Sequence, residues 1–177
     1  MLGSYNPRML RQLCITCVLT LSVGAQVVAS RPSFKDFPAK EVFQGKPAAP
    51  RLVTRGERMF QTRIRNGADN PVEFAGHYTL PRWGCGAGCS AFVIVDSTTG
   101  RIYDVPFSLV DLPYPWMEKH SEEPHDRMSF QPDSRLIKFD ACLNEADCGF
   151  YDYVMVEGKG LKLVRKELLP AEFQPAR

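Results

Sequence analysis

Three residue types that serve nucleophilic catalysis occur close together in the sequence. Cys89 follows a glycine-rich stretch whose backbone N–H groups would suit an oxyanion, and His77 and Asp96 would act as its base and as the orienting acid. This pattern predicts a cysteine-nucleophile hydrolase. It competes with a second interpretation, because Cys85 lies four residues away and would form a disulfide with Cys89 in an oxidising compartment. In that case no residue is predicted to be catalytic.

The N-terminus has the pattern of a secretory signal peptide. Arg8 and Arg11 precede an apolar run from Leu13 to about Ala25, and small residues lead up to Ala29. This run is shorter than the roughly 20 residues that a spanning helix needs. We therefore predict a signal peptide over residues 1–29, cleaved after Ala29 or alternatively after Ala25, with no membrane span left afterwards. The predicted localisation is periplasmic or secreted.

Four of the six cysteines lie beyond this segment, and an even number in an oxidising compartment predicts two disulfides. Chain entropy favours long-range bridges, at about 4 kcal/mol each against about 2 for a local loop. The sequence nevertheless places each pair around a short turn, which brings Cβ atoms close enough to bridge. We predict the local pairs. The spacings C-x3-C and C-x5-C differ from zinc knuckles, so neither a metal nor a cofactor is predicted. The cysteines are Cys85, Cys89, Cys142 and Cys148.

The charge balance bears on possible partners. The full chain carries 22 basic and 20 acidic residues, and removing residues 1–29 takes away only Arg8 and Arg11. The remaining chain is neutral and lacks the basic field that holds phosphate backbones, so nucleic acid is not a predicted partner.

Residues 30–50 hold four prolines and no apolar periodicity, which predicts an extended, poorly ordered arm. Residues 51–177 are predicted to form a single domain. It begins with one helix of about three turns, because Thr54 and Glu57 form a capping box, Met59, Phe60 and Ile64 share a face, and Gly67 can end the helix.

The rest of the domain has the pattern of antiparallel strands. The run 91–95 is apolar throughout, as in a strand covered on both faces, and turns are predicted at 96–100 and 157–160. The predicted fold class is α+β: a meander sheet of about six strands with the N-terminal helix packed on one face, stapled by disulfides. The predicted strands are 72–80, 91–95, 101–105, 136–141, 151–156 and 161–166.

A long proline-containing loop between residues 106 and 134 gathers Tyr114, Trp116, His120 and His125. Loops of this length are often functional, which predicts a recognition surface. The alternative is that Phe107 and its aromatic neighbours anchor the loop on the sheet. Both histidines could join a metal site, but their spacing does not place them on one helix face, so we predict a solvated loop. The acidic residues of that site would be Glu122, Glu123 and Asp126, with Pro124 interrupting.

Part of the sequence resembles a group of small exported bacterial proteins of unknown function. The resemblance covers about the middle third of the chain and implies export and a bacterial source, without an activity. It rests on the stretch Phe74-Ala75-Gly76-His77-Tyr78-Thr79-Leu80, on Trp83-Gly84-Cys85-Gly86 with Cys89, and on Val95-Asp96 with Thr99-Gly100-Arg101-Ile102-Tyr103.

These observations together predict a binding domain without enzymatic activity, periplasmic or secreted, whose loop contacts another protein or an envelope component. Two alternatives stay open. One is the hydrolase that uses Cys89 and His77, and the other is a structural envelope protein without a specific ligand.

Overall fold

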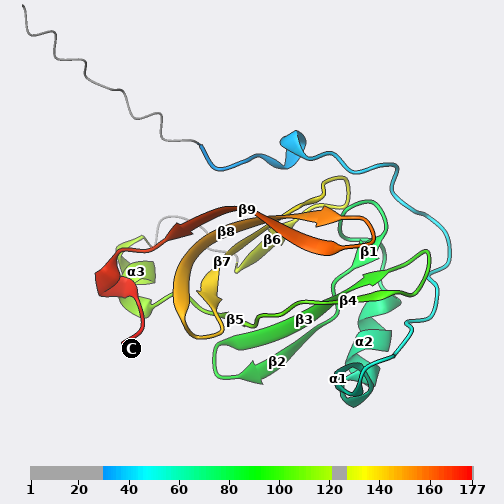
Figure 1. The fold of residues 1–177 in the computed structure, drawn as a ribbon, viewed down its shortest axis with the longest axis horizontal. Helices are drawn as coiled ribbons and strands as arrows, with labels where there is room; N and C mark the ends of the chain where they lie inside the picture. Colours follow the sequence, from blue (N-terminus) through cyan, green and yellow to red (C-terminus); the bar gives the residue numbers. More distant parts are fainter. Residues whose placement is uncertain (1–29, 121–126, 177) are drawn as a thin grey trace, which may run out of the picture. The chain divides into compact units, whose positions relative to one another are not determined.

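The computed structural model describes residues 30–120 and 127–176, where nine strands form one sheet with antiparallel pairing throughout (Figure 1). The predicted signal peptide lies outside the described residues. The strands are β1 (Tyr78–Thr79), β2 (Arg82–Gly86), β3 (Cys89–Asp96), β4 (Ile102–Asp104), β5 (Leu109–Val110), β6 (Met128–Phe130), β7 (Leu136–Leu143), β8 (Asp147–Val156) and β9 (Gly160–Leu168). The helices are α1 (Arg55–Met59), α2 (Gln61–Ala68) and α3 (Tyr114–Lys119), with short 3-10 turns at Phe34–Asp36 and Ala171–Phe173.

The sheet is organised around β3 and β7. Strands β1 and β2 pair with one edge of β3, and β4 and β5 pair with its other edge, so that Val95 faces both Thr79 and Ile102. The two-residue strand β5 also pairs with β7, which links this half to β6, β8 and β9. An antiparallel sheet was therefore predicted correctly. The predicted number of six strands was too low, because β2, β5 and β6 are short or glycine-rich and show no alternation.

The main core lies between the two halves of the sheet. Figure 1 shows β2, β3 and β4 below and β7, β8 and β9 above. Phe92 and Ile94 of β3 belong to the same buried cluster as Phe139 of β7 and Tyr151 and Met155 of β8. The sheet folds over on itself, so apolar side chains from both halves pack against one another and form the core.

The helices cover the other face of β3. Ile64 and Ala68 of α2 pack on Val93 and Val95, which alternate with the inward-facing residues of the strand. The prediction that the apolar run 91–95 is covered on both faces is thus confirmed. Helix packing on one face of the sheet is also as predicted.

The predicted single helix is divided at Phe60, which caps the C-terminus of α1 and the N-terminus of α2. The capping box of Thr54 and Glu57 is present. Phe60 stacks on Trp83 with the ring centroids 4.6 Å apart, but Met59 is 71% exposed and does not share that face. The break turns the helix so that the two apolar residues predicted together point in different directions.

Gly67 lies inside α2 and does not end it. A Cβ atom there would come within 2.7 Å of the Cα of Pro81, so the glycine allows the helix to approach the sheet closely. The structure requires a glycine at this position, but the reason is close packing and not helix termination.

Residues 72–77 form a tight loop where a strand was predicted. Only Tyr78 and Thr79 pair with β3. The loop closes through reciprocal hydrogen bonds between the backbones of Phe74 and Tyr78, and Ala75 and Gly76 have φ angles of +48° and +86°. Two successive residues in that region turn the chain too sharply for a strand.

Residues 30–50 were predicted to form an extended, poorly ordered arm. In the structure this segment includes the 3-10 turn Phe34–Asp36 and is attached to the domain by hydrogen bonds that the sequence did not indicate. The backbone N–H groups of Ala39, Phe43, Ala48 and Arg51 donate to carbonyls of Asp133, Gly76, Ser97 and Gly100 over 2.7–2.8 Å. At the start of the segment, Arg31 forms ion pairs with Asp140 and with Asp152, at 2.7 and 2.8 Å. This segment belongs to the same compact unit as the sheet.

The four cysteines beyond residue 29 form two local disulfides, Cys85 with Cys89 and Cys142 with Cys148, as predicted. Cys142 and Cys148 are directly opposite each other on β7 and β8. Two disulfides are typical of proteins from an oxidising compartment. In the described ranges, the helices are all too short or too polar to cross a membrane.

Candidate functional site

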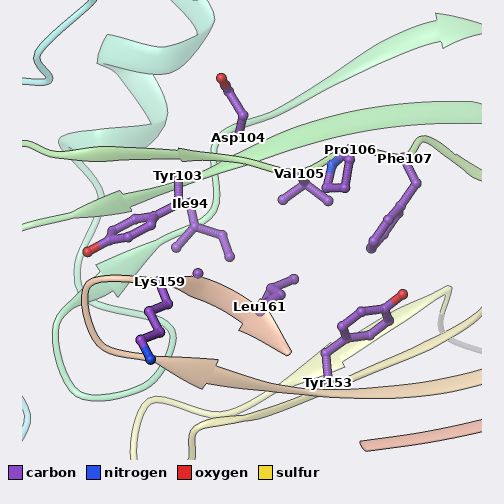
Figure 2. A pocket seen from close by; sticks show the side chains of 10 residues that line it. Ile94, Tyr103, Asp104, Val105, Pro106, Phe107, Tyr153, Lys159 and Leu161 are labelled. Atoms are coloured by element: carbon purple, nitrogen blue, oxygen red, sulfur yellow. The ribbon is translucent and has the colours of Figure 1, made fainter. Parts of the chain in front are cut away.

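An apolar pocket opens between β4 and the hairpin of β8 and β9 (Figure 2). We call it the aromatic slot, and its volume is about 370 Å³. This size falls in the range of pockets that hold small molecules. Its lining residues are Ile94, Tyr103, Asp104, Val105, Pro106, Phe107, Tyr153, Lys159, Gly160 and Leu161.

The slot exists because the folded-over sheet does not close. Among the described strands, β4 pairs only with β3 and β9 pairs only with β8, so each leaves one edge unpaired. The turn before β9 reaches β4 at one end, where a Cβ atom on Gly160 would lie 3.6 Å from the ring of Tyr103. At the other end Phe107 packs on Tyr153, with ring centroids 5.4 Å apart. The slot is the space between these two contacts.

Apolar side chains from β3, from β9 and from the residue after β4 line the middle of the slot. Figure 2 shows Ile94, Val105 and Leu161 turned toward one another, while the Asp104 carboxylate and the Lys159 ammonium point away from the centre. Ile94 is fully buried and anchors the floor, and Val105 and Leu161 are half-buried and reach the opening. The slot can therefore contact an apolar group while its charged residues stay in water.

The pKa values of two polar groups in the slot are raised. Burial raises the pKa of Tyr153, so its phenol stays protonated at neutral pH and can donate a hydrogen bond. Burial and the nearby carboxylate of Glu57 raise the pKa of Asp104.

The aromatic side chains of the predicted recognition loop differ in burial. Trp116 is 6% exposed and belongs to a buried cluster with both cysteines of the second disulfide, whereas Tyr114 is 69% exposed. His120 stacks on Trp116 at 4.3 Å, and its Nδ1 lies 2.8 Å from the Trp116 carbonyl oxygen. His125 and the acidic residues considered beside it lie outside the described residues. Trp116 thus has the anchoring role that was the alternative to recognition.

The structure brings His77 close to Asp96, since the backbone N–H of Ser97 donates to the His77 carbonyl oxygen at 2.8 Å, but it does not bring Cys89 to them. The sulfur of Cys89 is bonded to that of Cys85, so it is not a thiolate nucleophile. Cys89 and Asp96 lie at opposite ends of β3, seven residues or about 23 Å apart.

Asp96 has a local structural role instead. Its Oδ1 accepts hydrogen bonds from the Thr98 hydroxyl at 2.6 Å and from the backbone N–H groups of Thr98 and Thr99. Burial acts to raise its pKa, but these hydrogen bonds, together with the charge of His77, outweigh burial and lower it. The carboxylate therefore organises the turn after β3, which was predicted at residues 96–100.

Within residues 30–120 and 127–176, no cluster of three or more acidic, histidine or cysteine side chains has the arrangement of a metal site. The chain matches no protein-family model, no curated protein and no solved structure in the comparisons made. The resemblance to small exported bacterial proteins therefore stays a prediction.

Sequence reasoning missed the aromatic slot as a site. Its strands were predicted, and Phe107 was recognised as an anchoring aromatic residue. The lining residues nevertheless come from separate segments between residues 94 and 161 and form no linear motif. Only the pairing of the strands shows that Tyr103 and Tyr153 approach the same space.

Proposed function

We propose that this chain is an exported binding domain, periplasmic or secreted, that holds a flat apolar or aromatic group in the aromatic slot. The observation that carries the proposal is the slot itself: an opening between two unpaired strand edges, lined by Tyr103, Phe107 and Tyr153. Large aromatic side chains around an open pocket are the usual walls of a small-molecule site. The paired cysteines favour an exported location.

The walls define the chemistry of the ligand. Phe107 and Tyr153 already form an aromatic pair, and an inserted ring would add edge-to-face contacts of about 0.5–1.5 kcal/mol each. The neutral phenol of Tyr153 adds one hydrogen-bond donor. We expect a ligand with an apolar ring and at most a neutral acceptor.

Binding of the neutral fluorescent probe N-phenyl-1-naphthylamine tests the proposal. Leu161→Trp fills the slot and should weaken binding about tenfold or more, the equivalent of about 1.4 kcal/mol. Leu168→Trp is the matched control, because it lies at the far end of the same strand, seven residues from Leu161, is 46% exposed and does not line the slot. It should bind the probe as the wild type does.

Val105→Phe provides a second variant that narrows the slot from the opposite wall. Thermal unfolding of each variant checks that it still folds cooperatively. The proposal fails if the wild type does not bind the probe, or if Leu161→Trp and Leu168→Trp bind it equally well. Absence of binding would favour a structural envelope protein without a ligand.

A further inference from the structure

The two disulfides in the described part of the chain lie in very different surroundings. Cys142 and Cys148 are 4% and 0% exposed and belong to a buried cluster with Trp116 and Leu169. Cys85 is exposed and Cys89 is half-buried at the tip of the hairpin formed by β2 and β3. Attack on a disulfide requires a thiolate to reach one of its sulfur atoms, so only the Cys85–Cys89 bridge is accessible in the folded protein.

The hairpin also makes its two sulfur atoms unequal. Cys85 lies on β2, which pairs only with β3 among the described strands. Cys89 is paired on both sides, with Gly86 across the hairpin and with Val110 of β5. A partner can approach Cys85 from the open edge of the sheet, while Cys89 is held in place behind it.

Opening this bridge would leave the core intact. Apart from the half-buried Trp83, every residue of β2 is exposed, and Trp83 is held by its stacking on Phe60. Gly86 and Gly88 have φ angles of +147° and +65°, so the residues between the cysteines need the freedom of glycine to form the turn. The tip can rearrange after reduction without exposing buried apolar surface.

We propose that Cys85–Cys89 is a thiol–disulfide exchange site for a protein dithiol, whereas Cys142–Cys148 is a permanent structural bridge. A thiolate of the partner attacks the Sγ of Cys85, the bond to Cys89 breaks, and Cys89 leaves as a thiolate that takes up a proton. The second thiol of the partner then attacks the partner's own sulfur in the mixed disulfide and releases Cys85. Two electrons pass from the dithiol to the bridge, and the partner ends as a disulfide.

Reduced glutathione is the probe for the first step, applied to the folded chain. Aliquots are quenched with N-ethylmaleimide and analysed by peptide mass spectrometry, while circular dichroism follows the fold. We expect Cys85 and Cys89 to become reduced about ten times faster or more than Cys142 and Cys148. Glutathione should be found on Cys85, and the circular dichroism spectrum should be unchanged at that stage.

The buried bridge is the internal control. In guanidinium chloride the difference in rate should vanish, because unfolding exposes both bridges equally. Equal rates in the folded protein, faster reduction of Cys142–Cys148, or glutathione attached mainly to Cys89 would each overturn the proposal.

Two double variants distinguish a role in thiol–disulfide exchange from a role in the stability of the fold. Cys85→Ser with Cys89→Ser should retain cooperative unfolding close to that of the wild type, and it should take up no glutathione. Cys142→Ser with Cys148→Ser should melt at a clearly lower temperature. If the first double variant is the less stable one, the hairpin bridge is structural and the exchange proposal is wrong.

Discussion

Trp116→Ala should destabilise the domain strongly, although the residue lies in a long loop region. Its side chain is 6% exposed, packs in the cluster of the Cys142–Cys148 bridge and meets Phe150 edge-to-face with centroids 5.5 Å apart. Removing a buried tryptophan leaves a cavity and costs about 3–5 kcal/mol. For a domain of this size, such a loss lowers the melting temperature by roughly 10 °C or more.

Tyr114→Ala is the matched control, because it removes an aromatic residue from the same helix at a position that is 69% exposed. It should change the free energy of unfolding by no more than about 0.5 kcal/mol. Urea unfolding followed by far-ultraviolet circular dichroism measures both variants without relying on tryptophan fluorescence. Equal midpoints for Trp116→Ala and the wild type would refute the assignment of this residue to the core.

Two further pairs of variants test the packing of the other segments. Gly67→Ala brings a Cβ atom within 2.7 Å of Pro81, and the expected overpacking cost of about 1–3 kcal/mol exceeds the helix-propensity gain. Gly56→Ala in α1 is the control, because its Cβ atom would meet only Thr54 Oγ1, at 3.8 Å, and it should stabilise the domain by up to about 1 kcal/mol. If the urea midpoints of Gly67→Ala and Gly56→Ala shift in the same direction, this account is contradicted. Arg31→Ala leaves the fully buried Asp152 with Arg165 alone and should cost about 1–3 kcal/mol, since Arg31 itself is partly exposed. Lys40→Ala breaks only the exposed pair with Glu157 and should change the free energy of unfolding by no more than about 0.5 kcal/mol. If both variants melt at the same temperature as the wild type, the proposed role of Arg31 is wrong.

Local signals in the sequence predicted several elements correctly. The capping box at Thr54, the doubly covered run 91–95 and the turns after Asp96 and Val156 each depend on a few neighbouring residues. The local disulfide pairs were predicted for the same reason, since the turns between the cysteines are short. In each case the physical cause lies within about ten residues of chain.

Features set by distant contacts could not be predicted. Gly67 is required by Pro81, and the break at Phe60 accompanies its stacking on Trp83. The strand β5 is only two residues long and exists because β3 and β7 both pair with it. The aromatic slot forms because β4 and β9 do not pair with each other, and no single segment of the sequence could have predicted this.

A methyl NMR titration with N-phenyl-1-naphthylamine tests the proposed binding function most directly. The account predicts that the methyl resonances of Ile94, Val105 and Leu161 shift together, while those of the exposed Leu168 at the far end of β9 stay in place. Shifts confined to Leu168, or no shifts at saturating probe, would contradict it.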